Sequence, residues 1–216
     1  MRRHLLFDFD GTLVDSRALI VQLYNDIAAE HGFRSIQASD LQLLRTLSTR
    51  ERIAHLRVPL VQIPRLAVTA KQRYHDNVSR LHTVPGMRET VGRLLELGGR
   101  LSIVSSNSAA TIRAFLKGRR MDDAFSEVIS VKPLLGKQHA IGKYLKRHGL
   151  RAAQAMYVGD ELRDIEACRK LGMPIAAVTW GYDDVRLLRS GSPDYIVDSP
   201  QELLRVLAAR LATRSK

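Results

Sequence analysis

Phe7-Asp8-Phe9-Asp10-Gly11-Thr12-Leu13 is the stretch near the start of the chain from which the fold can be worked out. The apolar run from Leu5 to Phe9 predicts a short buried strand with Asp8 and Asp10 at its end. Because side chains of a strand alternate between its faces, carboxylates two positions apart point to the same side and repel one another. A divalent cation or a shared proton would relieve that repulsion. Gly11 then permits a turn that brings backbone N–H groups close to a ligand.

An ordinary turn cap is the alternative explanation for these aspartates. Capping accounts well for one of them. It accounts poorly for Asp8, which lies inside an apolar strand between two phenylalanines. We therefore treat the pair as a candidate catalytic or metal-binding site.

Further apolar runs alternate with helical patterns along most of the chain. The predicted strands are Leu101–Val104, Ala155–Val158 and Ile175–Val178, with weaker candidates at Glu127–Val131 and Tyr195–Val197. The clearest amphipathic helices are Thr90–Leu97, Ala109–Leu116, Gln138–His148 and Leu162–Leu171. This alternation predicts an α/β fold, a three-layer Rossmann-like core whose parallel sheet has helices on both faces.

Residues 16–83 break the alternation. Their pattern is helical at Ala18–His31, Asp40–Leu47, Glu51–Leu56 and Val68–Leu81, with no convincing strand. Pro59 and Pro64 are expected to separate helices here. We predict a helical domain at 16–83, hinged near Asp15-Ser16 and Thr83-Val84-Pro85, and inserted into a core made of 1–15 and 84–216.

Polar residues follow the predicted strand that ends near Val104. Ser105, Ser106 and Asn107 can donate hydrogen bonds to phosphate oxygens, and the helix after them adds its positive N-terminus. A Ser-Asn-Ser run is also an ordinary helix N-cap, and the two roles can coexist.

A lysine and a second pair of carboxylates complete the candidate site. Lys137 opens a helix, where its charge opposes the helix dipole, so we expect it to hold a phosphoryl oxygen; Lys132, in a Lys-Pro pair, is the competing candidate. Asp160 ends a strand and Asp164 lies one turn into the next helix, so both can face one site. Asp160 as a plain N-cap is the alternative. Open α/β sheets bind ligands at the carboxyl ends of their strands.

Composition limits the class of protein. The chain has 216 residues, 45% of them apolar, which suffices for one core and a small inserted domain. No apolar run reaches about 18 uncharged residues, so we expect no membrane span. The apolar run after the basic start is interrupted at once by Asp8 and Asp10, two carboxylates that a signal peptide would not carry there. The single cysteine, Cys168, cannot form a disulfide within the chain, and we expect a cytoplasmic protein.

The net charge of +12 raises the question of nucleic-acid binding. The basic residues are spread along the chain, and no helix-turn-helix or zinc-ligand spacing occurs. A basic surface also attracts small anions. We therefore expect small anionic substrates rather than nucleic acid as partners, and both a monomer and a homodimer remain open.

Taken together, these motifs resemble those of the haloacid dehalogenase superfamily. The run from Asp8 to Ser16 looks like its first motif, Ser105 its second, Lys137 its third, and Gly159-Asp160-Glu161 with Asp164 its fourth. The helical insertion resembles the small cap of that family. Within the superfamily the chain most resembles the phosphoglycolate phosphatase-like branch.

The resemblance implies a phosphatase mechanism. Asp8 would attack phosphorus and form an aspartyl-phosphate, and Asp10 would protonate the leaving alcohol and later take a proton from water. Ser105 and Lys137 would hold the phosphoryl oxygens.

The resemblance also implies a Mg²⁺ cofactor. Its ligands would be the side chains of Asp8 and Asp160 and the backbone carbonyl of Asp10, with Asp164 helping to fix the site. Carboxylates supplemented by water and substrate phosphate are ligands that Mg²⁺ prefers.

The inserted cap is expected to select the substrate. We place Leu47–Glu51 facing the site, where Arg50 could bind an anionic group of the substrate, although a solvated arginine early in a helix is the alternative. Trp180-Gly181-Tyr182 either lines the entrance or packs its loop. The alternative functions are a sugar-phosphate mutase of the same superfamily and a non-catalytic protein that binds anions or nucleic acid. Asp10 argues against dehalogenase chemistry, which does not need a second acid.

Overall fold

A parallel sheet forms the centre of the molecule. The computed structural model describes residues 3–131 and 136–212, and in them six strands pair in the order β5-β4-β1-β6-β7-β8. All pairs are parallel. The strands are β1 (His4–Phe7), β4 (Arg100–Ser105), β5 (Glu127–Ser130), β6 (Ala155–Gly159), β7 (Ile175–Val178) and β8 (Tyr195–Val197). The predicted α/β fold is confirmed, including both weaker strand candidates.

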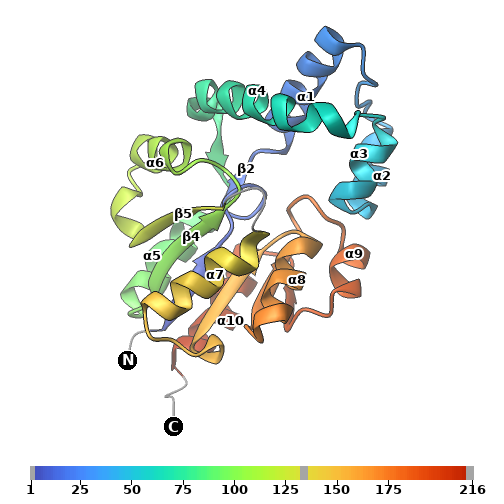
Figure 1. Cartoon of the computed structure of the whole chain (residues 1–216). Helices are drawn as coiled ribbons and strands as arrows, with labels where there is room; N and C mark the ends of the chain where they lie inside the picture. The colour runs from blue at the N-terminus through green and yellow to red at the C-terminus, as the bar shows by residue number, and fades with distance from the viewer. Residues whose placement is uncertain (1–2, 132–135, 213–216) are drawn as a thin grey trace.

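Helices cover both faces of the sheet, as Figure 1 shows. Leu5 and Phe7 of β1 pack in one apolar cluster with α5 (Met87–Glu96), α6 (Ala109–Gly118) and α10 (Pro200–Ala212). Leu6, between them, packs in a second cluster with α7 (Gly136–Arg147), α8 (Leu162–Leu171) and α9 (Val185–Ser190). Alternate residues of one strand thus supply two cores, as expected for a sheet buried on both faces.

Short 3₁₀ helices complete the core connections, at η3 (Asp122–Ala124) and η4 (Ala152–Gln154). Across residues 3–131 and 136–212, no helix is both long and apolar enough to cross a bilayer.

The segment after the first strand is helical. It contains α1 (Arg17–His31), α2 (Asp40–Thr46), α3 (Thr49–His55), η1 (Leu60–Gln62), α4 (Ile63–Asp76) and η2 (Val78–Arg80). In Figure 1 these helices lie together above the sheet, apart from those that cover its faces. We call this segment the cap. The domain boundaries at 16 and 83 stay a prediction.

Local signals explain where the cap helices begin and end. Ser48 caps α3 by a reciprocal pair of bonds, in which the Glu51 carboxylate accepts from the Ser48 backbone N–H at 2.7 Å. Gly32 ends α1 in the left-handed conformation, at φ 69°. Pro59 precedes η1 as expected, but Pro64 is the second residue of α4 rather than a separator. That expectation was wrong because a proline in the first helical turn loses no hydrogen bond.

A two-stranded antiparallel ribbon pairs the segment that leads from the sheet into the cap with the segment that leads back. It pairs β2 (Val14–Asp15) with β3 (His82–Thr83), with Val14 opposite Thr83. Below the ribbon, the Val84 N–H donates to the Leu13 carbonyl at 3.0 Å. The chain therefore leaves for the cap and returns from it side by side.

Candidate active site

Three neighbouring strands deliver the polar residues of the site. β1 lies between β4 and β6, and Asp8, Ser105 and Asp160 stand where these three strands end. The Asp8 N–H donates to the Val158 carbonyl of β6 at 2.8 Å, which continues the ladder to the end of the strand. All three side chains are buried. Parallel topology alone therefore gathers residues that are far apart in the sequence.

Asp8, Asp160 and Asp164 form a buried acidic cluster. One carboxylate oxygen from each lies within 4.8 Å of those of the other two. Asp160 is held on both oxygens, since Oδ1 accepts from the Thr12 hydroxyl at 2.7 Å and Oδ2 from the Tyr182 N–H at 2.8 Å. Converging carboxylate oxygens are the kind of ligand that Mg²⁺ and Ca²⁺ prefer, so this cluster is a candidate site for a divalent cation.

Lys137 lies inside this cluster. Its ammonium donates to the Asp8 carboxylate and, at 2.5 Å, to the Asp164 carboxylate. Burial by itself would lower the pKa of Lys137. The neighbouring Asp164 and Asp8 carboxylates raise the pKa by more than burial lowers it, so the net pKa lies above the ordinary value. The side chain therefore remains a cation. Lys132, the competing candidate, lies outside the described residues.

The electrostatics of the cluster favour additional positive charge. Burial raises the pKa of Asp160 well above its ordinary value, and the neighbouring Glu161 and Asp8 carboxylates raise it further. Burial also raises the pKa of Asp164 to about 6, against the opposing effect of the Lys137 ammonium. Lys137 and Arg163 both oppose the rise at Asp164, yet the pKa values of Asp160 and Asp164 stay above their ordinary values. A bound divalent cation would therefore stabilise the ionised forms of these groups.

Asp10 points away from the acidic cluster. Its carboxylate accepts a hydrogen bond from the hydroxyl of Tyr74, on cap helix α4, and one from the Asn107 amide at 3.1 Å. Burial raises the pKa of Asp10, while the bond from Tyr74 opposes that rise. An aspartate whose protonated form is favoured suits a general acid. Sequence reasoning missed Tyr74, because nothing in its helical pattern distinguishes it from a core residue.

The loop after β4 uses one polar residue to cap α6 and presents others to the site. Ser108 is the N-cap, and its hydroxyl accepts from the Thr111 N–H at 3.0 Å. Ser105 lies at the strand end, where its hydroxyl accepts from the Asn107 N–H at 3.2 Å. Ser106 and Asn107 line a cavity together with Asp10. Helix capping therefore falls to Ser108, whereas Ser106 and Asn107 are placed where they could bind a ligand.

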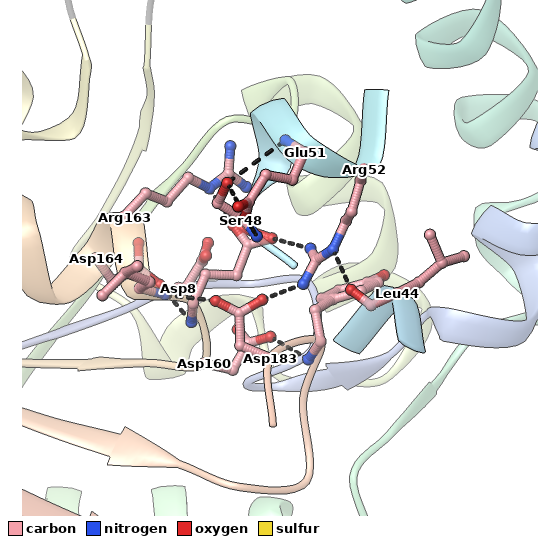
Figure 2. Close-up of polar contacts among 12 residues, drawn as sticks. Asp8, Leu44, Ser48, Glu51, Arg52, Asp160, Arg163, Asp164 and Asp183 are labelled. Atoms are coloured by element: carbon pink, nitrogen blue, oxygen red, sulfur yellow. Dashed lines mark hydrogen bonds and ion pairs between the residues drawn. The ribbon is translucent and has the colours of Figure 1, made fainter. Parts of the chain in front are cut away.

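The structure does not bring Arg50 to these groups. Arg50 is exposed, whereas Arg52 of the same helix reaches the core. The Arg52 guanidinium donates to the Asp183 carboxylate and, at 2.7 Å, to the Leu44 carbonyl. Figure 2 shows Arg52 extending from α3 to Asp183, close to the acidic cluster. The role predicted for Arg50 in substrate binding stays a prediction. Of the two arginines, Arg52 is the one whose guanidinium reaches the loop beside the acidic cluster.

The loop after β7 connects the cap with the acidic cluster. Asp183 accepts from Arg52 and, through Oδ2, from the Leu162 N–H at 2.6 Å, at the start of helix α8. A second contact nearby joins Arg45 of α2, whose guanidinium donates to the Thr179 carbonyl at 3.0 Å. The cap is thus bonded to the same loop that holds the residues around Asp160.

Trp180-Gly181-Tyr182 packs this loop against the site. The Trp180 indole donates to the Thr12 carbonyl at 3.2 Å. Gly181 lies so close to Asp160 that an added Cβ would be 2.1 Å from the Asp160 Cβ. The Tyr182 hydroxyl shares a hydrogen bond of 2.8 Å with Ser16, at the beginning of the cap. Of the two roles considered for this run, the observed contacts are those of loop packing.

Comparison with known proteins assigns the family. The family model described as haloacid dehalogenase-like hydrolase matches residues 5–178, which include the sheet centre and the candidate site. Fold and site define a protein with a parallel α/β core and an aspartate, Asp8, at the end of its first strand. The chain belongs to the haloacid dehalogenase-like hydrolases, and the resemblance inferred from the motifs is confirmed.

Relatives cover nearly the whole chain. A phosphoglycolate phosphatase from Synechococcus elongatus is 36% identical over 203 residues, which span 94% of this chain and 96% of that protein. The pyrophosphatase PpaX from Bacillus cereus is 26% identical and spans 94% of this chain and 95% of its own length. A haloacid dehalogenase-like hydrolase from Streptococcus pneumoniae superposes with a TM-score of 0.83 at 24% identity, covering 95% of this chain and 98% of that one. The similarity to the structure from Streptococcus pneumoniae supports the assignment of the fold.

Proposed function

We propose that this protein is a Mg²⁺-dependent phosphomonoester hydrolase that acts through a phosphorylated Asp8 on a small phosphorylated metabolite. That it is a phosphatase follows from its family and from its relatives, a phosphoglycolate phosphatase and a pyrophosphatase among them. The observation that carries the mechanism is the separation of its two central aspartates. Asp8 lies in the acidic cluster beside Lys137, and Asp10 faces the cavity beneath the cap.

The two aspartates divide the chemistry. The Asp8 carboxylate attacks phosphorus, and the bond from phosphorus to the ester oxygen breaks as that oxygen takes the proton of Asp10. Asp10, now ionised, then accepts a proton from a water molecule that attacks the phosphoryl group on Asp8. Inorganic phosphate leaves and the Asp8 carboxylate is restored. The raised pKa of Asp10, caused by its burial, suits the first of these proton transfers.

Lys137 and the β4 loop would bind the phosphoryl oxygens. Lys137 already contacts the Asp8 carboxylate, so its ammonium stands beside the atom that becomes phosphorylated. Ser105 and Asn107 add hydroxyl and amide donors from the neighbouring strand end. These groups are fixed before the substrate arrives, which reduces the cost of reorganisation during the reaction.

The donor set fits Mg²⁺. Three buried carboxylates converge to within 4.8 Å, and the pKa of Asp160 is raised by its burial and by its acidic neighbours. Asp8 and Asp160 would hold the ion directly, Asp164 would help to fix the site, and the Asp10 carbonyl would complete the protein ligands. The bound cation would offset the negative charge of the transferring phosphoryl group.

The test compares Asp8→Asn with Asp15→Asn. Asp15 ends β2, and its side chain is 52% exposed, so its amide variant controls for the loss of one carboxylate near the motif. Phosphate release from an aryl phosphate in Mg²⁺ should fall at least about a thousandfold in Asp8→Asn and stay near normal in Asp15→Asn. EDTA should abolish turnover and added Mg²⁺ should restore it.

Near-normal turnover by Asp8→Asn would refute the nucleophile, and turnover that survives EDTA would refute the metal. The cytoplasmic location and the choice between monomer and homodimer stay predictions from the sequence.

A further inference from the structure

A cavity of about 420 Å³ lies beneath the cap helices, directly over Asp10. Its volume is in the range of about 300–1,000 Å³ that is typical of small-molecule sites. Asp10, Ser106 and Asn107 form its polar end, and Tyr74 holds the Asp10 carboxylate there. The remaining walls come from α1, α3 and α4 of the cap.

The position of Asp10 decides which part of a substrate occupies this cavity. The phosphoryl group must contact Asp8 and Lys137, in the acidic cluster. The leaving oxygen must contact Asp10, which gives it a proton. The alcohol that carries this oxygen therefore extends from Asp10 into the cavity. This step rests on the proposed function, because it uses Asp10 as the general acid.

The cap walls of the cavity are mainly apolar. Three cap helices contribute side chains that include Leu23, Ile27, Ile53, Leu66 and Ala70, and Leu56 lines the cavity just after α3. Of the charged groups along these walls, Arg52 is ion-paired with Asp183, and Lys71 is an exposed residue. A carboxylate or a row of hydroxyls placed against the apolar walls would lose hydrogen bonds to water without replacing them.

We propose that the physiological substrate is a phosphate monoester of an alcohol with an aliphatic or aromatic body. The leaving alcohol fills the cap cavity, and its apolar surface is removed from water against α1, α3 and α4. Phosphoglycolate, whose leaving alcohol ends in a carboxylate, and sugar phosphates, whose leaving alcohols carry several hydroxyls, are poorer substrates of this chain.

A series of primary alkyl phosphates from methyl to hexyl tests the proposal in the wild-type enzyme with Mg²⁺. The leaving group stays a primary alkoxide throughout, so the intrinsic reactivity changes little and the apolar surface grows. The value of kcat/KM should rise by up to about fourfold per methylene until the cavity is full, which corresponds to about 0.8 kcal/mol per methylene. Hexyl phosphate should exceed both phosphoglycolate and glycerol phosphate at least about tenfold.

Two variants of α4 locate the effect in the cavity. Leu66 lines the cavity, whereas Val68 is 70% exposed on the same helix. Leu66→Asn should lower kcat/KM for hexyl phosphate about tenfold and leave methyl phosphate within about twofold. Val68→Asn, which places the same side chain in the same helix, should leave both substrates within about twofold.

A flat alkyl series, or a preference for phosphoglycolate, would overturn the proposed substrate class while the phosphatase assignment stands. Equal effects of the two variants would also overturn it. Failure to release phosphate from any ester would instead contradict the proposed function. The wild-type series decides the matter even if Leu66→Asn does not fold.

Discussion

Replacing Lys137 by methionine should destabilise the metal-free protein far more than an ordinary surface substitution. Lys137 and its partners Asp8 and Asp164 have side chains that are 5% exposed or less. Methionine keeps much of the side-chain volume but removes the cation, so the carboxylates that it contacts lose their buried counter-charge. Removal of one partner of a buried ion pair costs about 3–5 kcal/mol. We expect a loss in this range at pH 8 in EDTA.

Urea unfolding followed by fluorescence measures this loss. The chain has a single tryptophan, Trp180, and its indole is bonded to Thr12 beside the site, so the signal reports on the relevant region. Lys143→Met is the matched control, because Lys143 is exposed on the same helix, α7. The control should change the free energy of unfolding by no more than about 0.5 kcal/mol.

Two further conditions sharpen the comparison. Millimolar Mg²⁺ should restore part of the stability of Lys137→Met, because a cation that binds only the folded state stabilises it. The difference between variant and wild type should also shrink toward pH 5, below the pKa of about 6 to which burial raises Asp164, because the protonated Asp164 carboxyl no longer needs a counter-charge. If Lys137→Met in EDTA is no less stable than Lys143→Met, the reasoning about the buried cluster is wrong.

Three other changes probe the cap, the first strand and the turn after it. Arg52→Met should lower the free energy of unfolding by about 1.5–3 kcal/mol, since charge-assisted hydrogen bonds are lost, whereas Arg50→Met on the exposed side of the helix should cost about 0.5 kcal/mol or less. Equal losses in the two would contradict the observed contacts. Burial lowers the pKa of His4 to about 4, so the folded state favours the neutral ring, and the stability that this provides is lost as the pH falls from about 6.5 toward 4. In His4→Asn the free energy of unfolding should fall less over that range, and parallel pH curves would refute the assignment. Gly11→Ala should cost at least twice as much as Gly32→Ala in urea unfolding, because both have positive φ but the added methyl at Gly11 would lie 2.2 Å from a carboxylate oxygen, and nothing lies within 4 Å at Gly32. Similar losses would show that the close approach at Gly11 is relieved by movement.

The core of the site could be predicted because it depends on two simple regularities. Strand periodicity fixes which residues lie at the carboxyl end of a strand, and parallel pairing places all such ends at one edge. Asp8 and Asp160 are brought together in this way without any information about side-chain packing. Lys137 follows from the same logic, since it opens a helix that begins at that edge.

Contacts between cap and core could not be predicted in the same way. Tyr74 and Asp10 are 64 residues apart, and Arg52 and Asp183 are 131 residues apart. Helical periodicity indicates which face of α4 is buried but does not say against which group of the core it packs.

The choice between Arg50 and Arg52 depends on one piece of information that the sequence pattern lacks, the rotation of helix α3 about its own axis. Two positions apart on a helix, their side chains do not share a face, so only one of them can reach the core. The sequence pattern predicts a helix beginning at Glu51, whereas α3 begins at Thr49 and is capped by Ser48. The orientation of the helix then selects Arg52, and that orientation is a property of tertiary packing.

The ribbon of β2 and β3 has a consequence for how such an enzyme can diversify. Val14 and Thr83 pair with each other, so the segment between them is joined to the core at two adjacent points of the chain. A short β-turn is enough to bridge two paired antiparallel strands. We therefore expect the segment between the ribbon strands to be exchangeable for one of different length or shape without disturbing the strand ends below. A core of this kind could in this way acquire new substrates when the single segment between the ribbon strands is replaced.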